Sequence, residues 1–132
     1  MAVGALGMLS LGVFGGIWAC FQTTQLTREN LRATQILQQA TEVLRLCNWQ
    51  QTNPSSNYIP TSLMVPYDGA NSNGLNYQVS VTITNPPSSM TDVYTNDLRM
   101  VTLQVTWTSG NIQRTRSMTT FVSQYGIQNY VW

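Results

Sequence analysis

The chain has no lysine, no histidine and very little charge of either sign. Of its 132 residues, only six are arginine and five are Asp or Glu, which gives a net charge of +1. The absence of lysine and histidine excludes a P-loop lysine, a Schiff-base lysine, a histidine general base and every histidine metal site. A net charge this small gives no long-range field that would recruit nucleic acid. We therefore expect a protein that is not an enzyme, holds no cofactor or metal, and has no nucleic-acid partner.

Uncharged polar residues take the place of charge. Thr, Ser, Asn and Gln together make up 51 residues, and 17 of these are Thr. Such residues suit half-exposed strands, where one face is buried, and the surface loops between them. The length allows one domain in addition to the N-terminal segment.

The N-terminal segment is apolar and uncharged. From Met1 to Phe21 the only polar side chain is Ser10, and the first charged residue is Arg28. A bilayer is crossed by roughly 20 residues of helix, so residues 1–21 are predicted to form a helix that can span a membrane. The alternative is a cleaved secretory signal, but such a signal needs a basic start that this chain lacks.

Glycine is frequent within this apolar segment, which contains Gly4, Gly7, Gly12, Gly15 and Gly16. Each glycine costs a helix in water about 1 kcal/mol relative to alanine, so we expect these residues to serve packing. Gly12 and Gly16 form a G-x-x-x-G step, which lets apolar helices approach closely. The adjacent Gly15 and Gly16 are also a place where a helix can bend.

A polar segment that follows Phe21 keeps the helical period. An apolar stripe recurs every three or four residues and predicts an amphipathic helix: Leu26, Ala33, Leu37, Ala40 and Leu44. No proline occurs before Pro54, so one helix is expected from Met1 to about Trp49. Leu31 and Leu46 project from the charged face, where a monomer has nothing to bury them, and are candidates for contact with another subunit.

The remaining sequence has the pattern of an antiparallel sheet. A connecting loop is expected from Asn53 to Gly74, and alternating apolar residues then predict strands at 77–84 and 101–108. A third strand runs to about Ser123, and Arg114 and Arg116 mark it as an edge strand. The segment 125–132 is expected to be an extended aromatic tail. The predicted fold class is α+β, a long N-terminal helix packed on a small antiparallel sheet, divided into 1–21, 22–51 and 52–132.

The sequence gives only weak support for a disulfide or for a cation-binding site. On one continuous helix, Cys20 and Cys47 lie about 40 Å apart, too far for a disulfide within one chain. Both are interpreted as small buried apolar residues, and a bond between two chains is the alternative. Asp68, Asn71 and Asn73 lack the spacing of a calcium loop and are interpreted as turn residues. Asp92 and Asp97 are expected to cap the loop before the second strand, and a cation site is the less favoured alternative.

The order of these elements resembles a type IV pilin or a pseudopilin of the type II secretion system. The run QLTRENLRATQILQQATEVLRLCNW, residues 25–49, is similar to the exposed half of the helix in pilin-like proteins. The run VTLQVTWTSGNIQRTRSMTTFVS, residues 101–123, is similar to the last strand hairpin of minor pilins. The family signature places a glutamate at the fifth mature position, whereas this chain has Ala5 and no acid before Glu29. We therefore expect the sequence to start several residues inside the mature helix.

The resemblance implies a structural subunit of a helical filament. Such a subunit waits in the bacterial inner membrane until an ATP-driven assembly machine extracts it into an extracellular pilus or a periplasmic pseudopilus. The predicted self-assembly residues are Gly4, Gly7, Leu11, Gly12, Gly15, Gly16, Leu31 and Leu46. We also expect the helix to be interrupted between Gly12 and Ala19 in the assembled filament. The alternative is a single-pass membrane-anchored β-domain that binds a ligand and never polymerises, and such a protein has no use for Leu31 and Leu46.

Overall fold

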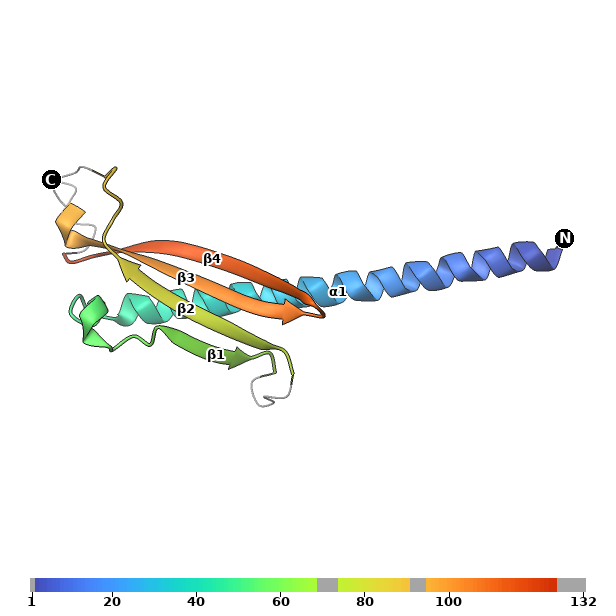
Figure 1. Cartoon of the computed structure of the whole chain (residues 1–132), viewed down its shortest axis with the longest axis horizontal. Helices are drawn as coiled ribbons and strands as arrows, with labels where there is room; N and C mark the ends of the chain where they lie inside the picture. The colour runs from blue at the N-terminus through green and yellow to red at the C-terminus, as the bar shows by residue number, and fades with distance from the viewer. Residues whose placement is uncertain (1, 69–73, 91–94, 126–132) are drawn as a thin grey trace. The chain divides into compact units, whose positions relative to one another are not determined.

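The structure, a computed structural model, contains one long helix and a four-stranded antiparallel sheet (Figure 1). It describes residues 2–68, 74–90 and 95–125, without the side chains of residues 2–6 and 8–10. The elements follow the order α1 (Ala2–Leu46), η1 (Pro54–Ser56), β1 (Ser62–Pro66), β2 (Asn76–Thr84), η2 (Thr95–Asp97), β3 (Leu98–Ser109) and β4 (Ile112–Ser123). The predicted α+β class is confirmed. The chain divides into two units, Met1–Arg32 and Ala33–Trp132, and the sheet belongs to the second.

Helix α1 ends at Leu46, earlier than the predicted end near Trp49. The cause is a reciprocal pair of hydrogen bonds just beyond the helix. The Asn48 backbone N–H donates to Gln51 Oε1, and the Gln51 backbone N–H donates to Asn48 Oδ1, each at 2.9 Å. This is the arrangement of a capping box, which starts a new turn rather than continuing the old helix. The Thr52 N–H then closes that turn on the Asn48 carbonyl oxygen at 3.1 Å.

The sheet has the strand order β1-β2-β3-β4, and every neighbouring pair is antiparallel. The predicted strands 77–84 and 101–108 lie within β2 and β3, and the third predicted strand is β4. β4 is an edge strand, as its two arginines indicated. The hairpin between β3 and β4 turns at Gly110, whose φ of 60° is the left-handed conformation that glycine adopts most readily.

Strand β1 corrects the sequence analysis, which placed residues 53–74 in a connecting loop. Five of these residues form the other edge strand, and Leu63 and Val65 pair with Val79 and Tyr77 of β2. The strand is short because Pro60 lies just before it and Pro66 is its last residue, and a proline cannot donate to a sheet ladder. Five residues that end in a proline are too few for the alternation to stand out from turn residues.

The core lies between one face of the sheet and the part of α1 that belongs to the same unit (Figure 1). The helix contributes four buried side chains, which are Ala33, Ile36, Leu37 and Leu44. The strands contribute the buried side chains of Tyr77, Val79, Val101, Leu103, Val105 and Trp107. On β2 and β3 these residues alternate with polar ones, so each strand turns one face to the helix and the other outward.

The outward face of the sheet is mostly polar and nearly free of charge, although Met64 and Phe121 also lie on it. Its cross-strand rows follow from the register, and one row consists of Thr82, Thr102 and Thr119. The row beside it consists of Ser80, Gln104 and Ser117. Cross-strand pairs of hydroxyl residues stabilise antiparallel sheets modestly. A solvent-exposed strand face favours residues that are both β-branched and polar, which explains the high threonine content.

The side chain of Arg99 fastens the turn after α1 to the start of β3. Its Nη1 donates to the Trp49 carbonyl oxygen at 2.6 Å and to Thr52 Oγ1 at 3.1 Å. The guanidinium carbon also lies 3.8 Å from the centroid of the Trp49 ring, a cation–π contact. Thr52 is fully buried, so its hydroxyl depends on this partner and on the Trp49 carbonyl. Desolvation by burial lowers the pKa of Arg99 below its ordinary value, yet the guanidinium stays charged.

We predict that Arg99→Ala lowers the free energy of unfolding by about 2 kcal/mol, because two hydrogen bonds from a charged donor and the ring contact are lost. Arg99→Lys should recover only part of this, since an ammonium group lacks the planar fork of the guanidinium. The measurement is urea unfolding followed by tryptophan fluorescence.

Arg45→Ala is the matched control for this prediction. Arg45 pairs with Glu42 at 3.2 Å on the helix surface, where both side chains are about 70% exposed. Such an exposed pair contributes less than about 0.5 kcal/mol. Equal effects of the Arg45 and Arg99 substitutions would contradict the fastening role of Arg99.

Candidate self-association surfaces

Eight residues were predicted to carry self-assembly, and all of them lie on α1. Leu11, Leu31 and Leu46 are exposed by 76%, 61% and 87% in the single chain. Gly7, Gly12, Gly15 and Gly16 are also exposed. Gly4 is one of the helix residues for which only the backbone is described. Exposure leaves these residues available for contact with another molecule, and their role in assembly stays a prediction.

Four of the glycines leave open space on the helix surface. A Cβ atom added at Gly7, Gly12, Gly15 or Gly16 would meet no atom within 4 Å. Their small size therefore relieves no clash within the chain. A shallow hollow lies at Gly16, bordered by Val13, Ile17 and Cys20. Close approach by a neighbouring helix, the packing role predicted for them, stays a prediction.

A second surface on the same helical segment is bulky. Leu11, Phe14, Trp18 and Phe21 recur at intervals of three, four and three residues, and each is exposed by about two thirds or more. At 100° per residue they lie within an arc of about 80°, on the side away from Gly12 and Gly16. We call these four residues the bulky stripe. Their spacing is that of the a and d positions of a heptad, the pattern by which helices bury one seam against a partner.

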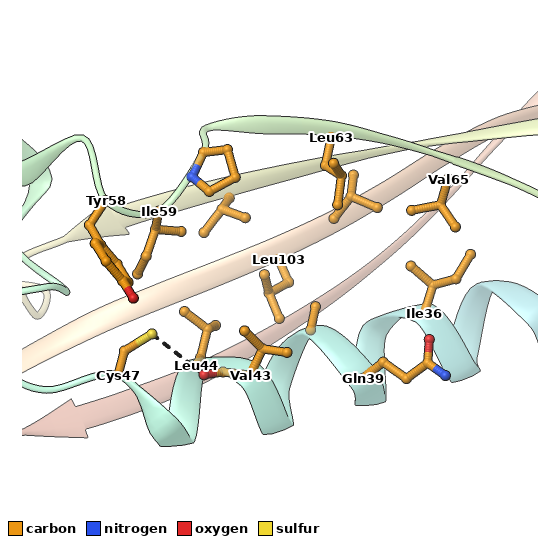
Figure 2. A pocket seen from close by; sticks show the side chains of 14 residues that line it. Ile36, Gln39, Val43, Leu44, Cys47, Tyr58, Ile59, Leu63, Val65 and Leu103 are labelled. Carbon is orange, nitrogen blue, oxygen red and sulfur yellow. Dashed lines mark hydrogen bonds between the residues drawn. The ribbon is translucent and has the colours of Figure 1, made fainter.

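A third surface is a groove of about 290 Å³ in the second unit. Figure 2 shows that Ile36, Val43 and Leu44 of α1 face Ile59, Leu63 and Val65 across it. Leu103 lies between the two sides, and Cys47 and Tyr58 lie near one end (Figure 2). We call this the apolar groove.

The apolar groove has no charged residue in its lining, and Gln39 is its one amide. Val43, Tyr58 and Leu63 are each more than half exposed although they border a hydrophobic surface. The Cys47 thiol donates a weak hydrogen bond to the Val43 carbonyl oxygen, at 3.5 Å. A contiguous exposed apolar surface of this kind marks a place where a partner or ligand binds.

The groove and most of the stripe were not predicted from the sequence. Leu11 was the one stripe residue predicted to serve self-assembly, although the sequence shows the heptad spacing of the other three. The groove gave no comparable signal, since its lining residues come from segments 36–47, 58–65 and 79–81 and from Leu103. Strand β1, which forms one wall, was itself missed.

The other candidate residues do not gather into a site within the described part of the chain. Cys20 and Cys47 are not joined to each other within the chain. Asp97 belongs to η2, and its carbonyl oxygen accepts a hydrogen bond from the Gln124 N–H at 2.9 Å. Asn71, Asn73, Asp92 and the tail from residue 126 lie outside the described residues. Over the described residues, no three His, Cys, Asp or Glu side chains gather into a possible metal site.

The predicted membrane segment falls partly outside the described side chains. In the part of the chain that is described, no helix is long and apolar enough to cross a membrane.

Comparisons with known proteins identify no relative. No protein-family model, no curated protein and no solved structure matches the chain.

We predict that Leu31→Gln and Leu46→Gln each weaken self-association severalfold while leaving the free energy of unfolding within about 0.5 kcal/mol, because neither side chain is buried in the single chain. Sedimentation of the assembled material and urea unfolding measure the two properties. Gln38→Ala, at another exposed position of α1, is the control and should change neither. Unchanged association in both leucine variants would contradict their predicted role.

Proposed function

We propose that this chain is a structural subunit of a type IV pilus-like filament, or of a type II secretion pseudopilus, and polymerises through its N-terminal helix. One observation carries the proposal. Six large apolar side chains between residues 11 and 21 are exposed by 48% to 76% in the single chain: Leu11, Val13, Phe14, Ile17, Trp18 and Phe21. These side chains cover about 160° of the helix circumference, and the other side carries only small, uncharged residues. A helix segment with so much exposed apolar surface and no charge is stable only in lipid or against other helices.

The architecture supports the same proposal. A long N-terminal helix packed through its C-terminal part on a four-stranded antiparallel sheet is consistent with a pilin-like fold. The sequence resemblance of segments 25–49 and 101–123 points to the same family. The subunit would be held in the bacterial inner membrane before assembly, and an assembly machine there would be its second partner. The filament would then be extracellular, or periplasmic in the case of a pseudopilus.

Leu31 and Leu46 favour the filament over the non-polymerising membrane anchor. They lie beyond the apolar segment, where a lipid-embedded helix would already have entered water. A monomeric anchor leaves both leucines in water, whereas neighbouring subunits in a filament can cover them.

Electron microscopy of the full-length protein, purified in mild detergent and then transferred out of it, tests the proposal. We expect helical filaments from the full chain and none from a chain that lacks residues 1–21. The truncated chain should be a soluble monomer that unfolds cooperatively, since the buried core comes from residues 33 onward. A full-length protein that stays monomeric under these conditions would favour the membrane anchor instead.

We predict that Gly16→Leu impairs filament formation at least tenfold and changes the free energy of unfolding of the sheet unit by less than about 0.5 kcal/mol. The new side chain meets open space in the single chain, so its clash arises only between neighbouring helices. Gly16→Ala is the milder matched variant and should have an intermediate effect. Normal assembly of the Gly16→Leu protein would contradict close helix packing at this position.

A further inference from the structure

The bulky stripe and the apolar groove are two different exposed surfaces of the same chain. The stripe presents Leu11, Phe14, Trp18 and Phe21 from a helix, each at least two thirds exposed. The groove is apolar, uncharged and bordered by the exposed side chains of Val43, Tyr58 and Leu63. A helix that carries large apolar residues at such intervals is the usual occupant of an apolar groove.

We propose that the bulky stripe of one copy docks in the apolar groove of a second copy. This inference rests on the proposed filament function, for which it names one contact between subunits. The partner is a second copy because each chain brings one stripe and one groove, and neither surface carries a charged residue that would require a counter-charge on another molecule.

The geometry of this contact leads to an open assembly. The stripe and the groove are different surfaces, so the contact is heterologous and a docked copy still has a free groove or a free stripe. Successive copies then add in one direction, and the assembly ends only if the rotation between copies closes a ring. A two-fold dimer, in which one surface meets itself, would stop at two copies.

The chain contains its own reporters for this contact. Cys47 lies in the groove, and Cys20 lies on the apolar helix but outside the stripe. Cys20 is one residue from Phe21, and the two positions differ by about 100° around the helix. A thiol can therefore be moved from outside the stripe into it by a shift of one residue.

The experiment mixes two full-length variants after the single thiol of the second variant has been loaded with one arm of a short bis-maleimide and free reagent has been removed, so that the other arm reaches Cys47 from within a docked pair rather than from solution. One variant is Cys20→Ser, whose only thiol is Cys47. The other carries Cys20→Ser and Cys47→Ser together with either Phe21→Cys or Leu11→Cys. In the control mixture, Cys47→Ser replaces the stripe variant, and its only thiol is the native Cys20. We expect at least one stripe variant to cross-link to Cys47 at least fivefold faster than Cys20 does.

Protection of Cys47 gives a second, independent readout. In the Cys20→Ser protein, alkylation of Cys47 should slow at least fivefold between dilute and concentrated protein. Adding Phe14→Gln and Trp18→Gln should remove this dependence on concentration. Adding Val13→Gln should preserve it, because Val13 is also exposed and apolar but lies about 80° around the helix from the nearest stripe residue.

The outcomes separate this inference from the proposed function. Filaments without preferential cross-linking would overturn the docking and leave the filament function standing. Preferential cross-linking without filaments would support the docking and count against the filament function. Protection of Cys47 in dilute protein on addition of phosphatidylethanolamine and phosphatidylglycerol vesicles, in the absence of the cross-link, would overturn the docking, since the groove would then bind acyl chains.

Discussion

The contact between residues 33–46 of α1 and the inner face of the sheet is the interaction on which the rest of the second unit depends. The sheet has a single layer, and its outward face is mostly polar, so the inner residues Val101, Leu103 and Val105 can be buried only by the helix. Apolar burial stabilises folding by about 25 cal/mol per Å², and here it is concentrated in one seam. The Arg99 contact to Trp49 and Thr52 then fixes the turn that follows the helix against the start of β3. The groove lies on the border of the same contact.

The groove exists because the helix covers the sheet unevenly. Ala33 is fully buried and lets the helix lie close to the strands, whereas Ala40 is only partly buried and lines the groove. On the β1 side the sheet is narrow, since Pro60 and Pro66 hold that strand to five residues. Val43 and Leu63 therefore face the same open space from opposite sides without filling it (Figure 2). Protein interiors are close-packed, so an unfilled apolar space of this size is a candidate binding surface.

The sequence predicted those parts of the structure that repeat with a regular period. The strands at 77–84 and 101–108 were found because alternation over eight residues is a strong local signal, and the buried stripe of Ala33, Leu37 and Leu44 was found because it follows the helical period. β1 was missed because a five-residue edge strand that ends in a proline has no such period. The helix end was misplaced by three residues because the Asn48 and Gln51 hydrogen bonds depend on backbone geometry beyond the helix. The groove was out of reach, since its residues meet only through tertiary folding.

The two edges of the sheet explain why copies of the chain would associate through the helix rather than by strand pairing. Exposed edges are the places where β-proteins most readily join, and natural sheets guard them with charge, proline or short strands. β1 is short and ends at Pro66, and β4 carries Arg114 and Arg116 among twelve residues. Arg116 is also engaged, since its Nη1 donates to Thr34 Oγ1 of the helix at 3.1 Å. Two of the six arginines in the chain thus lie on the one long edge, while the segment 1–27 has no charge at all. Because two of the few charged residues of the chain lie on β4, this edge disfavours pairing with a strand of another copy. The uncharged apolar part of α1 is then the surface available for contacts between copies.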